Sequence, residues 1–571
     1  MENKEGKFYK IFLEGKRPFL WIIFVVLFAY GMTLFSNIVY LDDNVLVVDQ
    51  YQFNKSLLNI PQAFNEDIFR RPQGGGTFYR PIERITFILD AQLGEKAIIF
   101  MSHLGNIVLH ILAICFLFLF LIKLKIKKEI AFLFSLIFAV HPLTAQTVAF
   151  ISGRNDSLLA IFVFPSFIFF IDYLETKIKK YFIWHLIFLA LALFTKETAA
   201  ILPIIFSIYL LIFVGWKNII ENYKTYFKIV ISWLGVGLTW FLIRGLVLGA
   251  MVGNASYNIP LSIWKNIPSL IPAIGKVFLP FSLSVFPVVK DMTMVYGLIS
   301  LALLTVWFIL SEKRNLKMII FGFSWFFIFI LLTLIKPLGT VPEFSENRIY
   351  IPMFGFIFVI LGLGRIKFPI SIKEKIYSKK AILIVSILII LIFSFVTIYR
   401  NQYYKNQFNF WDNAVETSPS FAFNHNNLGA MYYLKGDIIN AEKEFKKAIL
   451  LNPNEPMAHN NLGLVYTEKG FFIGAEEEYK KELEVNPNYE NAFFNLGLLY
   501  QQEQRYDEAV INWKNTLMVN PNYVDAIKAL FTYYYEKKDY GELIIYGSKL
   551  YSMGFNLPPE ILKIIQLSTI R

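Results

Sequence analysis

The sequence predicts an all-α protein in two parts, a polytopic membrane domain of about eleven transmembrane helices followed by an α-solenoid of short helical repeats. Of the 571 residues, 56% are hydrophobic and only 17% are charged. Many apolar runs are long enough to cross roughly 30 Å of hydrocarbon. From about residue 411 the chain becomes richer in Asn, Glu, Lys and Tyr, and a 34-residue self-similarity begins.

The membrane domain is predicted to cover residues 19–400, between a cytoplasmic N-terminus at 1–18 and a repeat domain at 401–571. Its first outer loop covers about residues 40–103. The first apolar run is too long for a signal-peptide core and no small-residue cleavage site follows it, so it is expected to be retained. The predicted spans are 19–39, 104–122, 130–148, 157–173, 181–195, 198–215, 227–249, 293–311, 317–335, 349–364 and 381–399.

Clusters of lysine and arginine orient these helices. They occupy the N-terminus and every second connection after it, near residues 123–128, 177–180, 217–228, 313–317 and 365–380. This is the positive-inside pattern, so the N-terminus is predicted to be cytoplasmic and the repeats extracytoplasmic. The same clusters account for most of the formal net charge of +12, so no nucleic-acid partner is predicted.

The segment 260–290 is apolar but contains five prolines. Counting it as a span would break the alternation of basic connections. We therefore expect a re-entrant or interfacial element on the outer side.

The C-terminal repeats have the spacing of helical hairpins. Their prolines at 419, 453, 487 and 521 are each 34 residues apart. In the first full unit, Leu428, Gly429 and Tyr432 lie on one face of the first helix, and Ala441 and Phe445 face them from the second. This pattern is typical of tetratricopeptide repeats, which bind extended peptides or partner helices.

One asparagine recurs at an equivalent position of each inner helix, at Asn427, Asn461 and Asn495. An amide both donates and accepts hydrogen bonds, so this ladder could hold the backbone of a peptide acceptor without reading its sequence. The alternative is that these amides only cap or solvate the groove.

Charged and polar residues collect in the outer connections, where a position near membrane depth makes them candidates for function. They are Asp42, Asp43, Arg80, His103, His141, Arg154, Asp156, Lys196, Glu197, Glu346 and Arg348. Arginine and lysine suit a lipid phosphate, and a nearby carboxylate can take the proton of an incoming hydroxyl as general base. The two adjacent acids could instead hold a divalent cation, although the sequence does not require one.

Each of these features also has a structural explanation. The acid pair could cap a helix, and His103, Asn106 and His110, at helical spacing, could form interhelical hydrogen bonds. Arg154 and Asp156 could be a local ion pair, and Lys196 with Glu197 an interfacial anchor.

The motifs together resemble the transmembrane and tetratricopeptide repeat-containing family, which is similar to protein O-mannosyltransferases with the GT-C fold. The resemblance covers nearly the whole chain and lies in "YLDDNVLV", "FYRPIERITFILD", "SHLGNIVLHILA", "FAVHPLTAQTVAFISGRNDSLLA", "LFTKETAAILP" and "ENRIYIPMFGF". The segment "RRPQGGGTF" departs from the family pattern.

This resemblance implies transfer of a sugar from a polyprenyl-phosphate donor, with a catalytic acid in the first outer loop. Asp42 and Asp43 match the family's acidic pair, and Arg80 matches its "RP" arginine. The remaining blocks are matched by His141, Arg154, Asp156, Lys196, Glu197 and Arg348.

From these features we expect an inverting, O-mannosyltransferase-like enzyme that glycosylates a protein hydroxyl on the non-cytoplasmic face of a bacterial inner membrane. Asp42 or Asp43 would be the base, and Arg80, Arg154, Lys196 and Arg348 would hold the donor phosphate. His103, His141, Asp156, Glu197 and Glu346 would support them. Two alternatives are a non-catalytic repeat scaffold for envelope proteins and a lipid-linked glycan polymerase or ligase.

Overall fold

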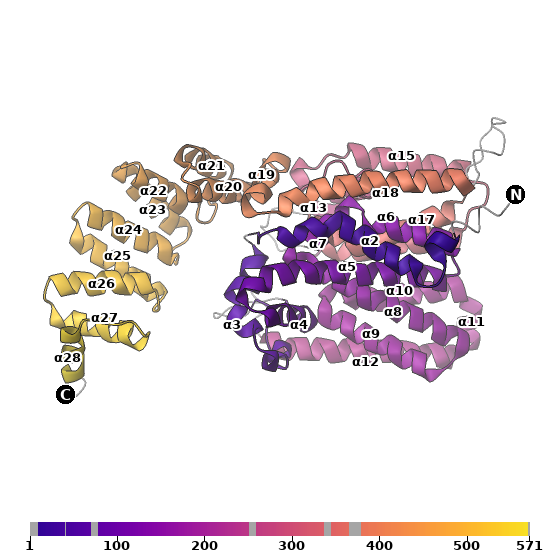
Figure 1. Ribbon diagram of the computed structural model, residues 1–571, viewed down its shortest axis with the longest axis horizontal. Coiled ribbons are helices and arrows are strands. Elements are labelled where there is room, and N and C mark those ends of the chain that lie inside the picture. The colour runs from indigo at the N-terminus through magenta and orange to yellow at the C-terminus, as the bar shows by residue number, and fades with distance from the viewer. Residues whose placement is uncertain are drawn as a thin grey trace. The chain divides into compact units, whose positions relative to one another are not determined.

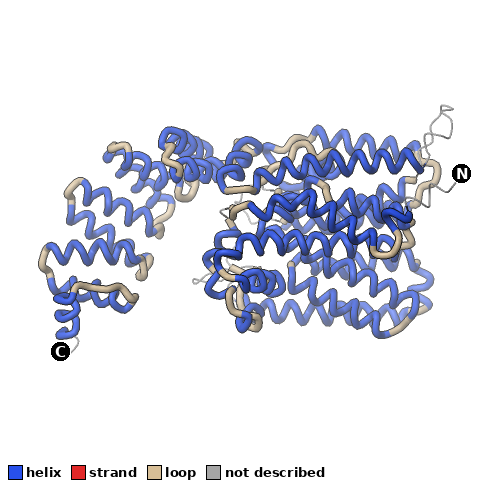
Figure 2. The backbone as a smooth tube through the Cα atoms, viewed as in Figure 1, coloured by secondary structure: helices blue, strands red, loops and turns tan. Residues whose placement is uncertain are grey.

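The computed structural model describes residues 9–39, 41–69, 78–249, 259–335, 344–364 and 379–568. Within these ranges the regular structure is helical and contains no strands (Figure 2). The chain divides into two compact units, Met1–Ser418 and Pro419–Arg571. An all-α fold with a membrane part and a repeat part is therefore confirmed.

The first unit is a bundle of long apolar helices that run roughly parallel or antiparallel to one another (Figure 1). Its main helices are α2 (Arg17–Tyr30), α5 (Ile98–Lys123), α6 (Lys128–Ala139), α8 (Asn155–Thr176), α9 (Lys179–Thr195), α10 (Leu202–Tyr209), α12 (Tyr223–Leu248), α15 (Val295–Leu310), α16 (Leu316–Leu331), α17 (Tyr350–Leu363) and α18 (Lys379–Asn401).

All eleven predicted spans coincide with helical segments, but they are not all equally long. In the described ranges, eight helices are long and apolar enough to cross a membrane. A ninth candidate is broken: it bends by 51° between Lys128–Ala139 and Pro142–Ala149. The other two, α9 and α15, have 17 and 16 residues, which is shorter than a full crossing perpendicular to the bilayer. The chain is an integral membrane protein with irregular as well as full-length spans.

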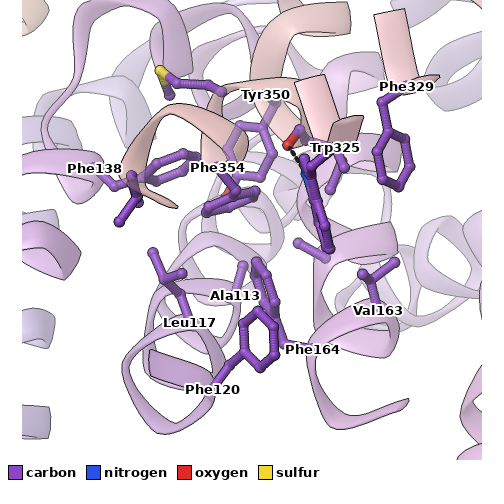
Figure 3. Close-up of a cluster of buried hydrophobic side chains, with 14 of the residues drawn as sticks. Ala113, Leu117, Phe120, Phe138, Val163, Phe164, Trp325, Phe329, Tyr350 and Phe354 are labelled. Atoms are coloured by element: carbon purple, nitrogen blue, oxygen red, sulfur yellow. Dashed lines mark hydrogen bonds between the residues drawn. The ribbon is translucent and has the colours of Figure 1, made fainter. Parts of the chain in front are cut away.

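The core of this unit is rich in aromatic side chains that pack closely against one another (Figure 3). The rings of Phe138 and Phe354 stack with centroids 4.1 Å apart, and Phe164 meets Phe354 edge-on at 4.6 Å. α16 and α17 approach at paired glycines, because a Cβ on Gly322 would lie 2.4 Å from the carbonyl oxygen of Gly355. Such close packing fixes the helix ends that carry the polar residues.

The proline-containing segment forms short helices, α13 (Ile259–Asn266) and α14 (Leu270–Phe278), and no long span. α14 packs closely on α15, since a Cβ on Gly275 would lie 2.5 Å from the backbone nitrogen of Gly297. Its placement at the outer surface of the bilayer stays a prediction.

The first outer loop is folded into short elements. Among the described residues they are η3 (Asn44–Asp49), α3 (Tyr51–Asn54), α4 (Pro81–Asp90) and four short 3₁₀ turns, η4 (Leu57–Asn59), η5 (Gln62–Phe64), η6 (Ala91–Leu93) and η7 (Glu95–Ala97). The glycine-rich segment 70–77 and most of the predicted basic cluster at 365–380 lie outside the described residues.

The second unit is a series of helical hairpins (Figure 1), and three of them close over a glycine of the first helix. A Cβ on Gly429, Gly463 or Gly497 would lie 2.5–2.7 Å from the ring of Phe445, Tyr479 or Trp513 respectively. The helices are α20 (Ala422–Leu434), α21 (Ile438–Leu451), α22 (Ala458–Glu468), α23 (Phe472–Val485), α24 (Glu490–Gln502), α25 (Tyr506–Val519), α26 (Val524–Glu536), α27 (Tyr540–Ser552) and α28 (Pro559–Ser568).

The boundary between the units lies later than the predicted position at residue 400. α19 (Gln407–Thr417) belongs to the first unit because it is bonded to the loop after α14. The Thr417 hydroxyl lies 2.6 Å from that of Ser284, and the Asn413 side chain accepts from the backbone nitrogen of Val285 at 3.3 Å.

Candidate functional site

A connected set of polar side chains gathers where several helices of the first unit begin or end. We call it the polar network; its members are Arg80, Glu83, Asn155, Asp156, Lys196, Glu197 and Asn347. It joins the start of α4, the start of α8, the junction between α9 and α10, and the turn η16 (Glu346–Ile349).

Arg80 lies at one end of the polar network. Its Nε donates to Glu197 at 3.1 Å, and its Nη1 donates to Glu83 at 3.5 Å. Pro81 starts α4 directly after Arg80, since proline is well suited to the first turn of a helix. This places Arg80 at the helix N-terminus with its guanidinium folded back over Glu83.

Lys196 lies at the centre. Its Nζ donates to Asp156 at 2.6 Å and to the side-chain oxygen of Asn155 at 2.8 Å. Burial lowers the pKa of Lys196, Asp156 opposes this shift, and the charges of Arg80 and Arg348 add to it. Arg348 therefore lies within electrostatic reach of the network.

The network remains partly open. The side chains of Arg80 and Glu197 are 14% and 25% exposed, whereas those of Lys196 and Asp156 are 10% and 5% exposed. Of these four side chains, those of Arg80 and Glu197 are therefore the most exposed to solvent.

Sequence reasoning missed three members, Glu83, Asn155 and Asn347. Glu83 is one helical turn after Arg80, a spacing that could have suggested a contact. Burial raises the pKa of Glu83 to about 6. Asn347 donates to Asp156 at 3.3 Å, and only the fold brings these residues together across the chain.

The two adjacent acids differ sharply in environment. Asp43 is 1% exposed, and its two oxygens accept from the backbone nitrogens of Ser152 at 2.9 Å and Val39 at 3.3 Å. Burial raises the pKa of Asp43 to about 7. Asp42 is exposed. Asp43 is linked to the polar network through Ser152, whose carbonyl accepts from Asn155 at 3.0 Å.

The described residues do not assemble a metal-binding set. No group of three or more His, Cys, Asp or Glu side chains in these ranges is arranged to hold an ion. Both oxygens of Asp43 already accept amide hydrogens, which does not fit a bridging pair with Asp42.

Arg154 has its hydrogen-bond partners outside the polar network. Its Nη1 donates to Asp90 at 2.6 Å and its Nη2 to the Ser102 carbonyl at 2.8 Å, while the guanidinium lies 4.1 Å from the centre of the Phe87 ring. The side chain is fully buried. The alternative of a local pair with Asp156 is wrong, because the partner is Asp90 and Asp156 binds Lys196.

Glu346 also lies in a separate buried group. It pairs with Lys276 from α14 and with Arg400 from α18, and it accepts from the backbone nitrogen of Ser284 at 2.9 Å. We call Lys276, Glu346 and Arg400 the buried triad; their side chains are 0–4% exposed. The triad fixes the start of η16, which carries Asn347 and Arg348.

The buried histidines and Asn106 mostly have structural partners. His141 caps η8 (Pro142–Thr144) and its Nε2 bonds the Val277 carbonyl at 2.9 Å. His110 joins the Tyr350 hydroxyl at 2.8 Å, and Asn106 donates to the Phe150 carbonyl at 2.9 Å, as the structural explanation predicts. His103 is 1% exposed and lies against the backbone of Ser36 and Asn37.

The repeat asparagines Asn461 and Asn495 each bond a different asparagine of the preceding repeat, and they do not bond one another. Asn461 donates to Asn426 at 3.0 Å and Asn495 donates to Asn460 at 2.9 Å, so each bond joins neighbouring repeats. Asn427 donates to the Phe423 carbonyl of its own helix at 2.7 Å. These bonds leave each amide partly exposed, with further hydrogen-bonding capacity for a peptide.

Comparison with known families agrees with this architecture. Residues 91–252 match the family model of dolichyl-phosphate-mannose-protein mannosyltransferases, and residues 429–470 and 490–521 match two tetratricopeptide repeat models. The mannosyltransferase match covers the segment that supplies Asn155, Asp156, Lys196 and Glu197 to the polar network.

Two of its relatives are named protein O-mannosyl-transferases. The chain is 24% identical over 469 residues to protein O-mannosyl-transferase F38B6.6 of Caenorhabditis elegans, covering 77% of this chain and 63% of that protein. It is 27% identical over 165 residues to protein O-mannosyl-transferase TMTC3 of Mus musculus, covering 27% of this chain and 18% of the mouse protein. The chain thus spans less than two thirds of these relatives. The resemblance to repeat-containing protein O-mannosyltransferases is confirmed.

Two of the solved structures that match, MamA and YrrB, each cover 28% of the chain. MamA is 20% identical and covers 28% of this chain and 92% of its own, with a TM-score of 0.23. YrrB, described as a TPR protein with an unusual peptide-binding site, is 21% identical over 28% of this chain and 82% of its own.

Proposed function

We propose that this protein is a membrane glycosyltransferase that moves a sugar from a polyprenyl-phosphate donor to a hydroxyl of a protein acceptor. The observation that carries the proposal is the partly open polar network beside the acid pair, in the segment that matches a mannosyltransferase model. Its chemistry combines cations for a phosphate with a carboxylate for a proton.

Arg80 is the first contact for the donor phosphate in this proposal. Of the two cations in the network, Arg80 is more exposed than Lys196, and a guanidinium binds phosphate in bidentate fashion. Lys196 and Arg348 add positive charge behind it. Asp156 and Glu197 hold these cations in place until the phosphate competes for them.

Asp42 acts as the base, and Asp43 anchors it. An exposed carboxylate can reach an acceptor hydroxyl, whereas Asp43 is held by two backbone amides. The base takes the hydroxyl proton, the acceptor oxygen bonds to the anomeric carbon, and the bond from that carbon to the phosphate oxygen breaks. The products are a glycosylated protein with inverted anomeric configuration and a free polyprenyl phosphate, as a single displacement requires.

The repeats supply the acceptor. A protein segment held in the groove near Asn427, Asn461 and Asn495 would have a raised local concentration at the membrane domain. The basic connections favour a cytoplasmic N-terminus with the repeats outside a bacterial inner membrane.

The test is sugar transfer by the full chain in proteoliposomes, with labelled polyprenyl-phosphate sugar and extracytoplasmic proteins as acceptors. Asp42→Asn should lower the rate about 100-fold or more, because it removes a general base. The conserved size of the side chain should leave folding and donor binding near those of the unchanged protein. Undiminished transfer by both Asp42→Asn and Asp43→Asn would contradict the proposal, as would transfer to glycans alone.

A further inference from the structure

Charge is divided unevenly between the two helices of the repeats. We call α20, α22 and α24 the inner helices, because each packs on its own hairpin partner and α20 also packs on α22, and α22 on α24. No Asp, Glu, Lys or Arg occurs at 422–434, 458–467 or 491–502. The second helices α21 and α23 carry five and seven such residues. Charge returns to the first helix of a hairpin in α26, where Asp525 and Lys528 are exposed.

The exposed side of the inner helices has two rows of side chains. The first row consists of the three repeat asparagines, and the second lies one turn further along each helix. Residues three apart lie on the same side of a helix, so the two rows are neighbours. We call them together the inner face; its members, all partly exposed, are Asn427, Asn461, Asn495, Ala430, Leu464 and Leu498. The inner face thus offers amides beside apolar side chains and carries no charge.

Charged groups that reach the inner helices from the second helices are buried and already bonded. Glu444 bonds His425 and Glu478 bonds His459, both at 2.6 Å. Glu482 has no exposed surface, and it accepts from the backbone nitrogen at the start of α22 at 2.9 Å. These carboxylates are therefore not available to a partner on the inner face.

The asparagines belong to one chain of side-chain hydrogen bonds that crosses the repeats. Asn495 donates to Asn460 at 2.9 Å, and Asn460 donates to Asn461 at 3.4 Å. Asn461 donates to Asn426 at 3.0 Å, and Asn426 donates to the Pro456 carbonyl at 3.4 Å. The chain uses one of the two hydrogens of each amide nitrogen and fixes its orientation. The second N–H of Asn461 and of Asn495 is therefore a pre-oriented donor, which lowers the entropy cost of binding.

The spacing of the inner helices favours an extended ligand. Packed helices lie about 8–10 Å apart. A polyproline II segment advances about 9 Å in each turn of three residues, so it presents the same backbone group to each inner helix in succession. Its backbone makes no internal hydrogen bonds, so its carbonyls are free to accept from the asparagines. The carbonyls of an α-helix are already used within the helix.

We propose that the inner face binds an uncharged segment of another protein in the extended polyproline II conformation. The asparagine amides bond every third peptide group of this segment, and Leu464 and Leu498 contact its apolar side chains. This inference rests on the proposed function for the role of the segment as acceptor, and it names the class of acceptor. A charged side chain at this contact loses water and gains no partner, so the inner face selects against acidic and basic segments.

The experiment measures binding of fluorescent peptides to the full chain in nanodiscs of zwitterionic lipid, with no sugar donor present. The probe is an uncharged peptide of about 12 residues that repeats Pro-Ala-Gln, a proline-rich composition that favours polyproline II. Two matched peptides carry Lys or Glu in place of every Gln. We expect the uncharged peptide to bind about tenfold more tightly than either charged peptide, with an affinity that does not depend on salt. Equal binding of the three peptides would overturn the inference.

Two substitutions test the two rows of the inner face. Asn461→Ala should weaken binding of the uncharged peptide about fivefold, because it removes one amide from the chain. The matched control is Asn515→Ala, which removes a partly exposed asparagine from α25 and should leave the affinity unchanged. Equal affinities of these two variants would also overturn the inference.

Leu464→Lys adds one cation to the inner face. It should weaken binding of the uncharged peptide about tenfold and strengthen binding of the Glu peptide, with an affinity that now falls as salt is added. A misfolded variant would not gain affinity for the Glu peptide, so this result does not depend on a separate test of folding. Unchanged binding of all three peptides would place their site elsewhere and contradict the inference.

The outcome is separate from that of the proposed function, because the probe has no hydroxyl to be glycosylated. Selective binding of the uncharged peptide by a chain that transfers no sugar would keep the inner face as a binding site and remove its role in transfer. Sugar transfer to proteins by a chain that binds the three peptides equally would keep the enzyme and remove this inference.

Discussion

The polar network and the buried triad are built from the same residue types but differ in how their charges are satisfied. In the network, Arg80 and Glu197 stay 14% and 25% exposed, and their contact is 3.1 Å long. In the triad, Glu346 is fully buried and both of its oxygens are taken by cations. The pair of Arg154 and Asp90 resembles the triad, because Arg154 has no exposed surface.

This difference separates residues that can bind a substrate from residues that hold the site in place. A fully buried cation that is already paired with a buried carboxylate is closed to a phosphate. A partly exposed cation can exchange its partner at modest cost, since solvent screens the pair that is broken. The triad and the Arg154 pair therefore support the helix ends, and the polar network presents the reactive surface.

The largest expected effect is on stability and concerns the triad. Glu346→Ala leaves Lys276 and Arg400 buried without their carboxylate, which should cost about 3–5 kcal/mol. Glu197→Ala breaks a partly exposed pair and should cost about 1 kcal/mol or less. Thermal unfolding in detergent measures the loss of stability of each variant. Equal losses of stability would contradict the distinction between the triad and the network.

A smaller effect concerns the pH dependence of stability through Asp43. Its pKa is raised from 3.8 in a model peptide to about 7 in the fold, so the folded state binds the proton more tightly. The contribution of this group to stability should fall as pH rises from about 4 to about 7 and stay constant above that. Asp43→Asn should flatten this part of the stability curve, and an unchanged curve would contradict the burial of a titrating Asp43.

The smallest expected effect on stability is in the repeats, where a histidine–glutamate pair recurs after 34 residues. His425 and His459 each bond a glutamate of the next helix at 2.6 Å. The hydrogen bond to Glu478 raises the pKa of His459, so its stabilising contribution is complete below pH 6.5 and is lost as pH rises through the raised value.

His459→Gln should therefore cost about 1 kcal/mol at low pH and less at high pH. Hydrogen exchange of α22 in the full chain measures the difference. The third unit has Phe493 and Asn512 at these positions, so α24 is the internal control and should show no such pH dependence.

Much of the fold could be predicted from the sequence, because apolar length and the 34-residue period are local properties. The predicted helices and repeats are present, but the bend at His141 and the shortness of α15 were not predicted. They depend on partners far away in the chain, such as the Val277 carbonyl bonded by His141.

The site could be predicted only in part. Sequence reasoning grouped Arg80, Lys196, Asp156 and Glu197, and the fold brings them together. It also grouped Arg154 and Glu346 with them, although each lies in a closed pair or triad. Arg154 is paired by Asp90, and Glu346 is paired by Lys276 and Arg400. No local sequence pattern relates these partners to the outer motifs.

The most direct test of the central claim compares Arg80→Met with Arg154→Met. Each substitution removes one guanidinium, and both arginines belong to the outer motifs of the sequence. Folded protein is measured by thermal unfolding, and sugar transfer from labelled polyprenyl-phosphate sugar is measured per folded molecule. We expect Arg80→Met to fold and to lose about 100-fold or more of its transfer rate. Arg154→Met should lose about 3–5 kcal/mol of stability and retain transfer in the fraction that folds. Full transfer by Arg80→Met, with transfer lost from well-folded Arg154→Met, would contradict the account.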